Sequence, residues 1–316
     1  MTSGQEYRDI SGILLLDKPH GMSSNQAMQK ARYLFRARKA GHTGSLDPLA
    51  TGMLPICFGE ATKIAGHLLG ARKAYSAECR LGVTTTSDDA EGEVVATRAV
   101  PAIDAAALEA AMQPLRGRIM QTAPIYSALK QGGVPLYKRA RRGEDVEAPT
   151  RTVEVFRLDA VAHADDALRL YVECGSGTYV RSLARDLGEK LGCGAHLTAL
   201  RRLWVEPFRE PAMHTWGQLE AVHAERGPDG LDALLLSLDE GLVALPALHL
   251  SPEEAIALRH GRRLRRVGIR TATPWRALDA DNRLVALVEA DANGDVRVLR
   301  GFNAAVQPGS DRRIWI

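Results

Sequence analysis

The chain has 316 residues with a formal net charge of +3, and its four cysteines lie far apart with no CxxC pair among them. This length predicts one large domain with a smaller one, and the cysteine spacing argues against a disulfide framework or a structural zinc site. The first residues, MTSGQEYRDI, do not resemble a signal peptide, and no apolar run approaches the roughly 20 residues of a membrane helix, so we expect a cytoplasmic protein without a membrane segment.

The first predicted elements are a strand and a helix that lead into a polar loop. Residues 13–16 are apolar and are followed by Pro and Gly, which predicts a short buried strand. Residues 23–25 offer an N-cap, and the apolar residues from 27 to 35 fall on one helical face. The loop that follows, AGHTGSLDPLATG at residues 40–52, is long for a compact domain, and such loops are usually functional.

Two strands and two helices are predicted in the middle of the chain. YSAECRLGV at residues 75–83 and LRLYVEC at residues 168–174 read as strands, and the second alternates apolar with polar residues. Residues 180–191 form an amphipathic helix that a glycine ends, and residues 102–111 form an alanine-rich helix. Because these elements lack the regular βαβ order of a Rossmann fold, we expect a mixed α/β or α+β sheet.

Two later parts of the chain differ in character. Residues 124–151 are basic and rich in Gly and Pro, which predicts an inserted excursion or a merely mobile surface loop. After about residue 245, SPEEAIALRHG predicts a helix capped by Ser251, and the Asn293-Gly294 pair predicts a two-residue hairpin turn. We therefore expect a large domain over residues 1–245 and a small, mostly β domain over residues 246–316.

Basic residues gather in three clusters, although the net charge is small. The clusters are Lys30, Arg32, Arg36, Arg38 and Lys39; Lys138, Arg139, Arg141 and Arg142; and Arg259, Arg262, Arg263, Arg265, Arg266 and Arg270. One such cluster is as well explained by a solvated face as by a binding site. Three together favour a polyanionic partner.

Asp47 is the most distinctive candidate for chemistry. Held between glycines and a proline, it fits a nucleophile, a general base, a metal ligand or an ordinary Asp-Pro turn. A metal is disfavoured because no second carboxylate lies at short spacing in the loop. A phosphate site is disfavoured as well, because the loop lacks GxxxxGK[ST] and a central carboxylate would repel phosphate.

Several segments resemble one family, in the same order, over most of residues 11–316. They are GILLLDKPHGMSS, GHTGSLDPLATG, ATKIAGHLLGARKAYSAECRLGVTTTSDDAEG, PIYSALKQGGVPLYKRARRGE and CGSGTYVRSLARDLGEKLGCGAHLTALRRLWV, together with the C-terminal module. They resemble the TruB family of tRNA pseudouridine synthases, which act on position 55 in the T arm. The resemblance implies a large, mixed, mainly antiparallel sheet with flanking helices and a small, mostly β PUA-like RNA-binding domain.

The resemblance also assigns three catalytic residues. It makes Asp47 the catalytic carboxylate, Tyr75 the aromatic residue that stacks on the target uracil and Arg181 the arginine that pairs with the aspartate. Isomerisation oxidises nothing and transfers nothing to a second substrate, so no metal or cofactor is required. The tRNA T-arm stem-loop is the expected partner, no obligate protein partner is implied, and the protein is expected to be a monomer.

Further residues resemble those that contact RNA near the site. They are His42, Asp89, Tyr179, Leu200 and Lys18. His42 resembles a histidine that fills space vacated by flipped bases, and Leu200 an apolar residue under the flipped base. Because TTTSDDAEG departs from the family pattern, the RNA-contacting aspartate is either Asp88 or Asp89.

The chemistry explains why these residue types occur together. A stacked base is unreachable, so it must be flipped out and held against an aromatic face. A buried carboxylate would become neutral without a cationic partner, which an arginine provides as a bidentate fork. The carboxylate acts either as a nucleophile or by removing a ribose proton, and the sequence leaves both open. Two other interpretations are an RNA-binding protein that has lost its chemistry and a small-molecule enzyme with a glycine-rich anion loop.

Overall fold

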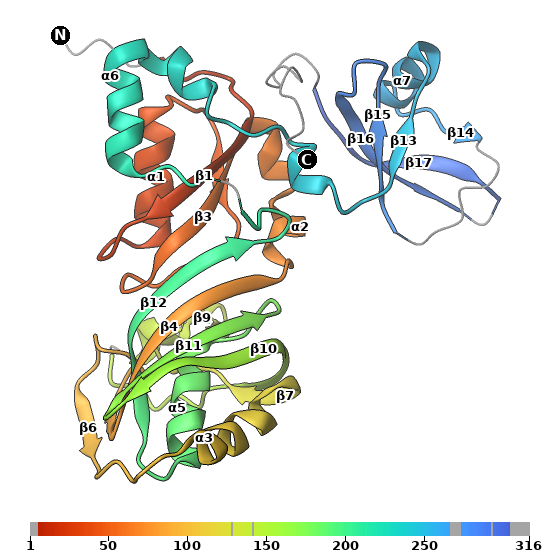
Figure 1. The fold of residues 1–316 in the computed structure, drawn as a ribbon. Helices are drawn as coiled ribbons and strands as arrows, with labels where there is room; N and C mark the ends of the chain where they lie inside the picture. The colour runs from red at the N-terminus through yellow and green to blue at the C-terminus, as the bar shows by residue number, and fades with distance from the viewer. Residues whose placement is uncertain are drawn as a thin grey trace.

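The computed structural model describes residues 6–127, 129–140, 142–210, 212–265, 273–291 and 293–303. Its main body is an eight-stranded sheet in the order β1-β3-β12-β4-β11-β10-β7, with β2 beside β3 (Figure 1). The strands are β1 (Gly12–Lys18), β2 (Ala40–His42), β3 (Thr51–Phe58), β4 (Lys73–Leu81), β7 (Gly117–Thr122), β10 (Thr150–Ala164), β11 (Ala167–Cys174) and β12 (Ala195–Val205). Among these described strands only β12 and β3 pair in parallel, so the predicted mixed, mainly antiparallel sheet is confirmed.

Helices cover one face of this sheet and enclose the main core. They are α1 (Ser24–Leu34), α3 (Ala105–Met112), α5 (Val180–Lys190) and α6 (Trp216–Asp232), and all contribute buried residues. α1 begins where the sequence predicts because the side chains of Ser23 and Gln26 cap each other's backbone. Leu183 and Leu187 of α5 are at most 1% exposed, and burying one leucine stabilises a fold by about 1.5–3 kcal/mol. α6 is not among the elements predicted from the sequence.

A second apolar cluster lies on the other side of β1 and β3. There Ile13 and Met53 pack against the 3-10 helix η1 (Gly59–Lys63), the short helix α2 (Ala65–Leu69) and the segment that follows α6. The two clusters together bury both faces of this part of the sheet. The strands that carry the candidate site are therefore fixed from both sides. Across the described ranges, no helix combines the length and apolar composition needed to cross a bilayer.

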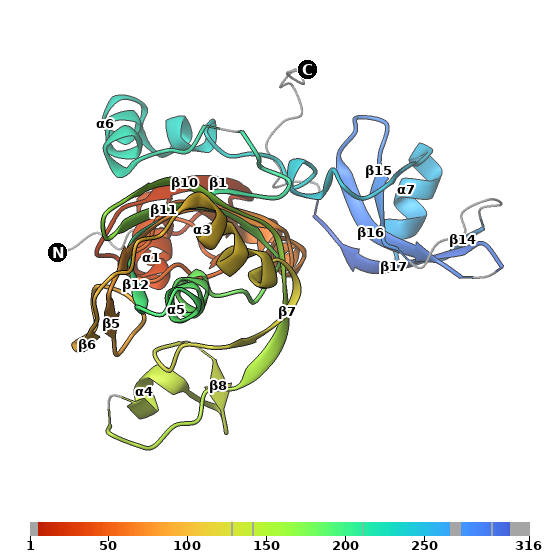
Figure 2. The same cartoon turned by 60° about the horizontal axis from the view of Figure 1, so that its bottom comes forward.

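Two excursions leave the sheet. β5 (Val83–Thr85) and β6 (Val94–Thr97) form a hairpin after β4, and a predicted basic insert lies between β7 and β10. The insert contains the pair β8 (Lys130–Gln131) and β9 (Val134–Pro135) and the short helix α4 (Leu136–Ala140). Figure 2 shows it projecting below the sheet, on the side where α5 lies. Thr150 and Arg151, which the prediction gave to the insert, already belong to β10, and Arg141 lies outside the described residues.

The C-terminal module is built on a five-stranded sheet in the order β13-β15-β16-β17-β14. Its elements are β13 (Ala247–His249), α7 (Pro252–Arg259), β14 (Leu264–Arg265), β15 (Trp275–Leu278), β16 (Leu284–Ala290) and β17 (Asp295–Gly301). Ser251 caps α7, as predicted. The predicted two-residue hairpin turn is one residue longer: the Asp291 N–H donates to the Asp295 carbonyl and Gly294 has φ 82°, which a bulged turn requires. Arg266 and Arg270 of the third basic cluster lie outside the described residues.

The module packs against the main body (Figure 1). Leu278, Leu284, Leu287 and Phe302 join the second apolar cluster, so the two parts share a core. The Arg276 guanidinium donates to both carboxylate oxygens of Asp239, at 2.7 and 2.8 Å, and the Lys63 amine donates to the Gly301 carbonyl at 3.0 Å. These contacts hold the module beside the end of β3, close to η1.

Candidate active site

The loop that carries Asp47 is fixed by the start of α1 and the end of β1. The Ser24 hydroxyl donates to the Leu46 carbonyl at 3.0 Å and accepts from the Leu46 N–H at 2.6 Å. The Asp47 carbonyl accepts from the Ala50 N–H at 3.0 Å, which closes the Asp-Pro turn. The Lys18 amine donates to the Pro48 carbonyl at 3.5 Å. The turn that the sequence offered as an alternative is therefore present, and it positions the carboxylate.

Arg181 brings two carboxylates together. Its Nη2 lies 2.9 Å from Asp47 Oδ2, and its Nη1 lies 3.3 Å from Asp89 Oδ2. The same two nitrogens donate to the carbonyls of Tyr126 and Ser87, both at 2.9 Å. The side chains of Arg181 and Asp89 are only 5% and 3% exposed, whereas that of Asp47 is 42% exposed. Asp47 is thus the accessible end of a buried ion-pair network.

Burial and ion pairing act in opposite directions on the pKa of the Asp47 carboxyl group. Burial raises the pKa of this carboxyl group, and the charge of Arg181 opposes the rise. Asp89 raises the pKa further by like-charge repulsion, and Lys18 lowers it. Removing the guanidinium would leave two carboxylates facing each other, which costs about 3–5 kcal/mol for a broken buried pair. Arg181 therefore holds the charge state of the site as well as its geometry.

The structure separates the roles of Asp88 and Asp89. Asp89 belongs to the Arg181 network, and its carboxylate also accepts from the Glu91 N–H at 3.1 Å. Asp88 has φ 61° and pairs instead with Arg185, at 2.9 Å. The adjacent aspartates thus point to different arginines of α5. The expected RNA contact of Asp89 stays a prediction, and its burial indicates that any such contact needs a rearrangement.

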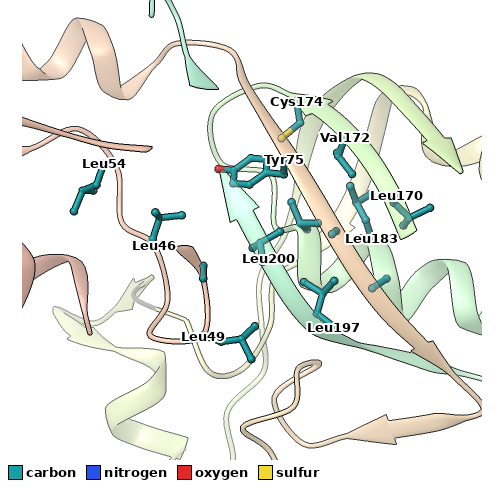
Figure 3. Close-up of a cluster of buried hydrophobic side chains, with 14 of the residues drawn as sticks. Leu46, Leu49, Leu54, Tyr75, Leu170, Val172, Cys174, Leu183, Leu197 and Leu200 are labelled. Atoms are coloured by element: carbon teal, nitrogen blue, oxygen red, sulfur yellow. The ribbon is translucent and has the colours of Figure 1, made fainter. Parts of the chain in front are cut away.

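A pocket of about 490 Å³ opens beside Asp47. It is lined by Ser45, Leu46, Asp47, Leu69, Lys73, Tyr75, Leu129, Arg151, residues 175–181, Leu200 and Arg202. Figure 3 shows the Tyr75 ring beside Leu200, with Leu46 and Leu49 of the loop facing them. Five of the eight site residues expected from the sequence therefore line one pocket: Asp47, Tyr75, Tyr179, Arg181 and Leu200. This volume is typical of small-molecule and cofactor sites and is ample for one flipped base.

Tyr75 and Tyr179 occupy different parts of this pocket. Tyr75 lies on β4, is 8% exposed and is the register partner of Arg202 on β12. Burial raises the pKa of Tyr75, and the charge of Arg202 opposes the rise. Tyr179 is the N-cap of α5, where its backbone exchanges hydrogen bonds with the Gln121 amide, and the Arg151 guanidinium lies 5.0 Å from its ring centre.

His42 and Lys18 are not among the residues that line the pocket. His42 lies on β2, and burial together with the charge of Arg202 lowers its pKa, which favours a neutral ring. Lys18 is fully buried at the end of β1, where its amine donates to the carbonyls of Pro19 and Met22 at 2.9 and 2.5 Å. This geometry assigns Lys18 to ordering the loop, and its contact with RNA stays a prediction.

Three pocket cations were not predicted from the sequence: Lys73, Arg151 and Arg202. A usable signal existed for two of them. Lys73 precedes Tyr75 by two residues on one strand and Arg202 follows Leu200 by two on another, so each shares a face with a predicted site residue. Arg151 lacks such a signal, because its contact with Tyr179 joins distant segments.

A hollow of about 620 Å³ near β7 and α5 contains none of the predicted site residues. Within the described ranges, no three His, Cys, Asp or Glu side chains lie together as metal ligands would. The four cysteines are buried thiols without disulfides.

The chain matches known families along almost all of its length. Residues 32–180 match the TruB family pseudouridylate synthase N-terminal domain. Residues 181–243 match the tRNA pseudouridylate synthase B C-terminal domain, and residues 245–303 match the tRNA pseudouridine synthase II C-terminal family. All three descriptions concern the same kind of enzyme.

Curated relatives agree with these matches, and solved structures share the fold. The tRNA pseudouridine synthase B of Xanthomonas campestris pv. campestris (strain 8004) is 56% identical over 95% of this chain and 97% of its own length. That of Pseudomonas aeruginosa (strain UCBPP-PA14) is 50% identical over 92% of this chain and 95% of its own. A chain of a Cbf5-Nop10-Gar1 complex is similar in fold, with TM-score 0.69 and 24% identity over 90% of this chain and 79% of that one. A chain of an H/ACA RNP bound to a substrate RNA containing 2'-deoxyuridine has TM-score 0.72 and 22% identity, over 94% of this chain and 87% of that one.

Proposed function

The chain belongs to the TruB family of tRNA pseudouridine synthases, and from this premise we propose that it isomerises the uridine at position 55, in the T-arm stem-loop of tRNA. The observation that carries the proposal is the Arg181–Asp47 ion pair at 2.9 Å, on the wall of a pocket that Tyr75 also lines. A carboxylate held by a buried guanidinium beside an aromatic face suits chemistry on a flipped base.

The first step is seating the target uridine. The base leaves its stack and enters the pocket, where the Tyr75 ring offers one face and Leu200 an adjacent apolar surface. The ribose then lies toward Asp47, the most exposed member of the ion-pair network. His42 fills space near the vacated stack. The base is thus bound by Tyr75 and Leu200, whereas the sugar faces the carboxylate that attacks it.

The second step is exchange of the glycosidic bond. Asp47 adds to C1' as the N1–C1' bond breaks, or it removes a ribose proton and gives an unsaturated sugar. The freed uracil turns, and C5 bonds to C1' as the Asp47–C1' bond breaks or as the unsaturated sugar takes back its proton. The C5 proton must then leave, and we assign its removal to the Tyr75 oxygen, because Asp47 is already engaged. Burial raises the pKa of Tyr75, and the charge of Arg202 opposes part of that rise.

RNA outside the pocket is held by the basic surfaces. The insert between β7 and β10 and the C-terminal module carry exposed basic residues: Lys130, Arg142, Arg262, Arg263 and Arg265. Phosphate contacts of this kind position RNA without reading its sequence. The protein acts as a monomer in this proposal. Asp89 contacts a base only if RNA binding breaks the ion pair between Asp89 and Arg181.

The decisive experiment incubates the purified protein with full-length tRNA and with a T-arm stem-loop, and then maps pseudouridine along the RNA. We expect one modified uridine, at position 55, in both substrates. Modification at another position would contradict the proposed target. Tight binding without any modification would instead favour an RNA-binding protein that has lost its chemistry.

A further inference from the structure

Two buried cations line the pocket without a carboxylate partner among the residues that the structure describes. Lys73 is 6% exposed and Arg202 is 1% exposed, and neither forms an ion pair there. Buried charges are costly unless they are paired. The nearby Arg181 follows this rule, because it contacts two carboxylates. Lys73 and Arg202 therefore need another explanation.

Neutral groups hold these two side chains in place. The Lys73 amine donates to the carbonyls of Leu69 and Ala71, at 3.0 and 2.6 Å. The Arg202 guanidinium donates to the carbonyls of Met53 and Gly44, at 2.6 and 3.2 Å. Carbonyls satisfy the N–H groups but carry no net charge, so neither cation is neutralised by the groups that hold it.

The two cations lie close to each other. A Cβ atom on Gly44 would lie 3.7 Å from both Arg202 Nη1 and Lys73 Cε, so both side chains reach the same part of the loop. Arg202 is also the register partner of Tyr75 across β12 and β4. The site thus concentrates positive charge next to the aromatic residue on which the base is proposed to stack.

We propose that Lys73 and Arg202 stabilise the negative charge that the uracil ring acquires when it detaches from the sugar. This inference rests on the proposed function. When the N1–C1' bond breaks, its electron pair stays on the ring and spreads over N1 and the two carbonyl oxygens. C1' gains its new bond from Asp47, or a C1'–C2' double bond after loss of the 2' proton. C5 then returns the electron pair to C1' as the Asp47–C1' bond breaks, or as C2' of the unsaturated sugar takes back its proton. The C5 proton leaves and N1 gains a proton, so nothing is oxidised or reduced.

Two other cations near the site, Arg181 and Lys18, are less suited to contact the uracil ring. Arg181 is held by Asp47 and Asp89. The Lys18 amine is held by backbone carbonyls, as the Lys73 amine is, but Lys18 is not among the residues that line the pocket. A phosphate of the flipped nucleotide is the rival occupant for Lys73 and Arg202. We favour the ring, because both cations share strand faces with Tyr75 and Leu200, which line the base-binding part of the pocket.

The test compares two RNAs with the full-length protein. T-arm stem-loops carry uridine or 5-fluorouridine at the target position, and the readout is single-turnover loss of the original N1–C1' linkage. Fluorine withdraws electrons and stabilises the detached ring. We expect Lys73→Met to slow cleavage of the uridine RNA by about 10²-fold, as removal of one preorganised electrostatic group does, and to slow the fluorinated RNA about tenfold less. Lys190→Met, which removes an exposed lysine outside the pocket, should leave both rates unchanged.

An equal deficit on both RNAs, or a loss of RNA affinity with normal cleavage at saturation, would overturn the inference. The second result would assign the cations to a phosphate. If the wild-type protein makes no pseudouridine, the proposed function fails instead, so the two failures are distinguishable.

Lys73→Arg keeps the test decisive if Lys73→Met fails to fold. The pKa of Lys73 is lowered to about 8: burial and the charge of Arg202 on β12 lower it, and Cys174 on β11 and Glu206 after β12 partly oppose this. Lys73 loses its proton as pH rises through this value, so kcat/KM of the wild type should fall above about pH 8. Lys73→Arg should stay active above that pH, since guanidinium remains charged. An unchanged pH profile in this variant would contradict the cationic role.

Discussion

The pocket and the C-terminal module use positive charge in opposite ways. In the pocket, Arg181 and Arg202 are almost fully buried, and each is held by several backbone or side-chain acceptors. In the module, Arg262, Arg263 and Arg265 are exposed around β14. The buried charges have fixed geometry, whereas the exposed ones face solvent. Under the proposed function, we expect chemistry to depend on the first arrangement and RNA affinity on the second.

The free-energy cost of losing a charge also differs between the two regions. Breaking a buried ion pair costs about 3–5 kcal/mol, whereas an exposed pair contributes only about 0–1 kcal/mol. A factor of ten in a rate or an affinity corresponds to about 1.4 kcal/mol. Variants in the pocket should therefore change turnover by orders of magnitude with little change in affinity. Variants in the module should change affinity modestly and leave turnover alone.

The largest effect is expected for Asp47→Asn. The amide keeps the shape of the side chain but has no charge, so it neither attacks C1' nor removes a ribose proton. We expect single-turnover isomerisation to fall by more than about 10⁴-fold, as for the loss of a catalytic nucleophile, with tRNA affinity within several-fold. Asp186→Asn is a matched control, because Asp186 lies on α5 and pairs with Arg185 outside the pocket. Turnover by the purified Asp47→Asn variant above background would refute the assignment.

Arg181→Lys comes next. An ammonium group is a point charge and does not span Asp47 and Asp89 as the planar guanidinium does. We expect turnover to fall roughly 10²- to 10³-fold, the usual cost of losing one electrostatic group of a catalytic site. Arg185→Lys, four residues along the same helix, pairs with Asp88 and should stay within a few-fold of wild type. Similar losses in both variants would mean that the effect comes from α5 as a whole.

Tyr75→Phe separates stacking from proton transfer. Phenylalanine keeps the aromatic face, so RNA binding should be unchanged. If the hydroxyl removes the C5 proton, product formation should fall about 10²-fold, within the range of a lost general base, and tritium release from C5-labelled RNA should fall with it. Tyr171→Phe is the control, because its hydroxyl donates to Glu173 outside the pocket lining. Unchanged rates for Tyr75→Phe would leave Tyr75 as a stacking platform only.

The sequence predicts features that depend on neighbouring residues better than features that depend on distant ones. Local patterns are sufficient for the start of α1, because Ser23 and Gln26 are neighbours, and for the cap of α7. The Asp47 loop stands out as a motif. Arg202 shares a strand face with Leu200, which is a local signal, but its place next to Tyr75 follows only from strand register, because the two residues are 127 positions apart by their numbers.

Burial is the other property that local patterns do not show. Lys18 reads as a residue available to RNA, yet its amine is enclosed by backbone carbonyls. Asp88 and Asp89 are indistinguishable in sequence, and only the packing of α5 against their loop assigns them to different arginines. The sequence therefore indicates candidate residues for the site, whereas the fold decides which of them line the pocket.

The smallest effect is expected when Arg262, Arg263 and Arg265 are changed together to alanine. Deleting the whole module would be a poorer test, because Leu284 and Phe302 belong to a core shared with the main body. Each exposed charge contributes about 0.2–1 kcal/mol, so affinity for full-length tRNA should weaken roughly tenfold. The slope of log affinity against log salt should also become shallower, by roughly 0.7–0.9 for each phosphate that the protein no longer neutralises. Turnover at saturating RNA should not change, since these side chains do not reach the pocket. Activity on the short T-arm stem-loop provides the contrast: if that substrate is impaired as strongly as full-length tRNA, the module takes part in catalysis and the division between the two regions is wrong.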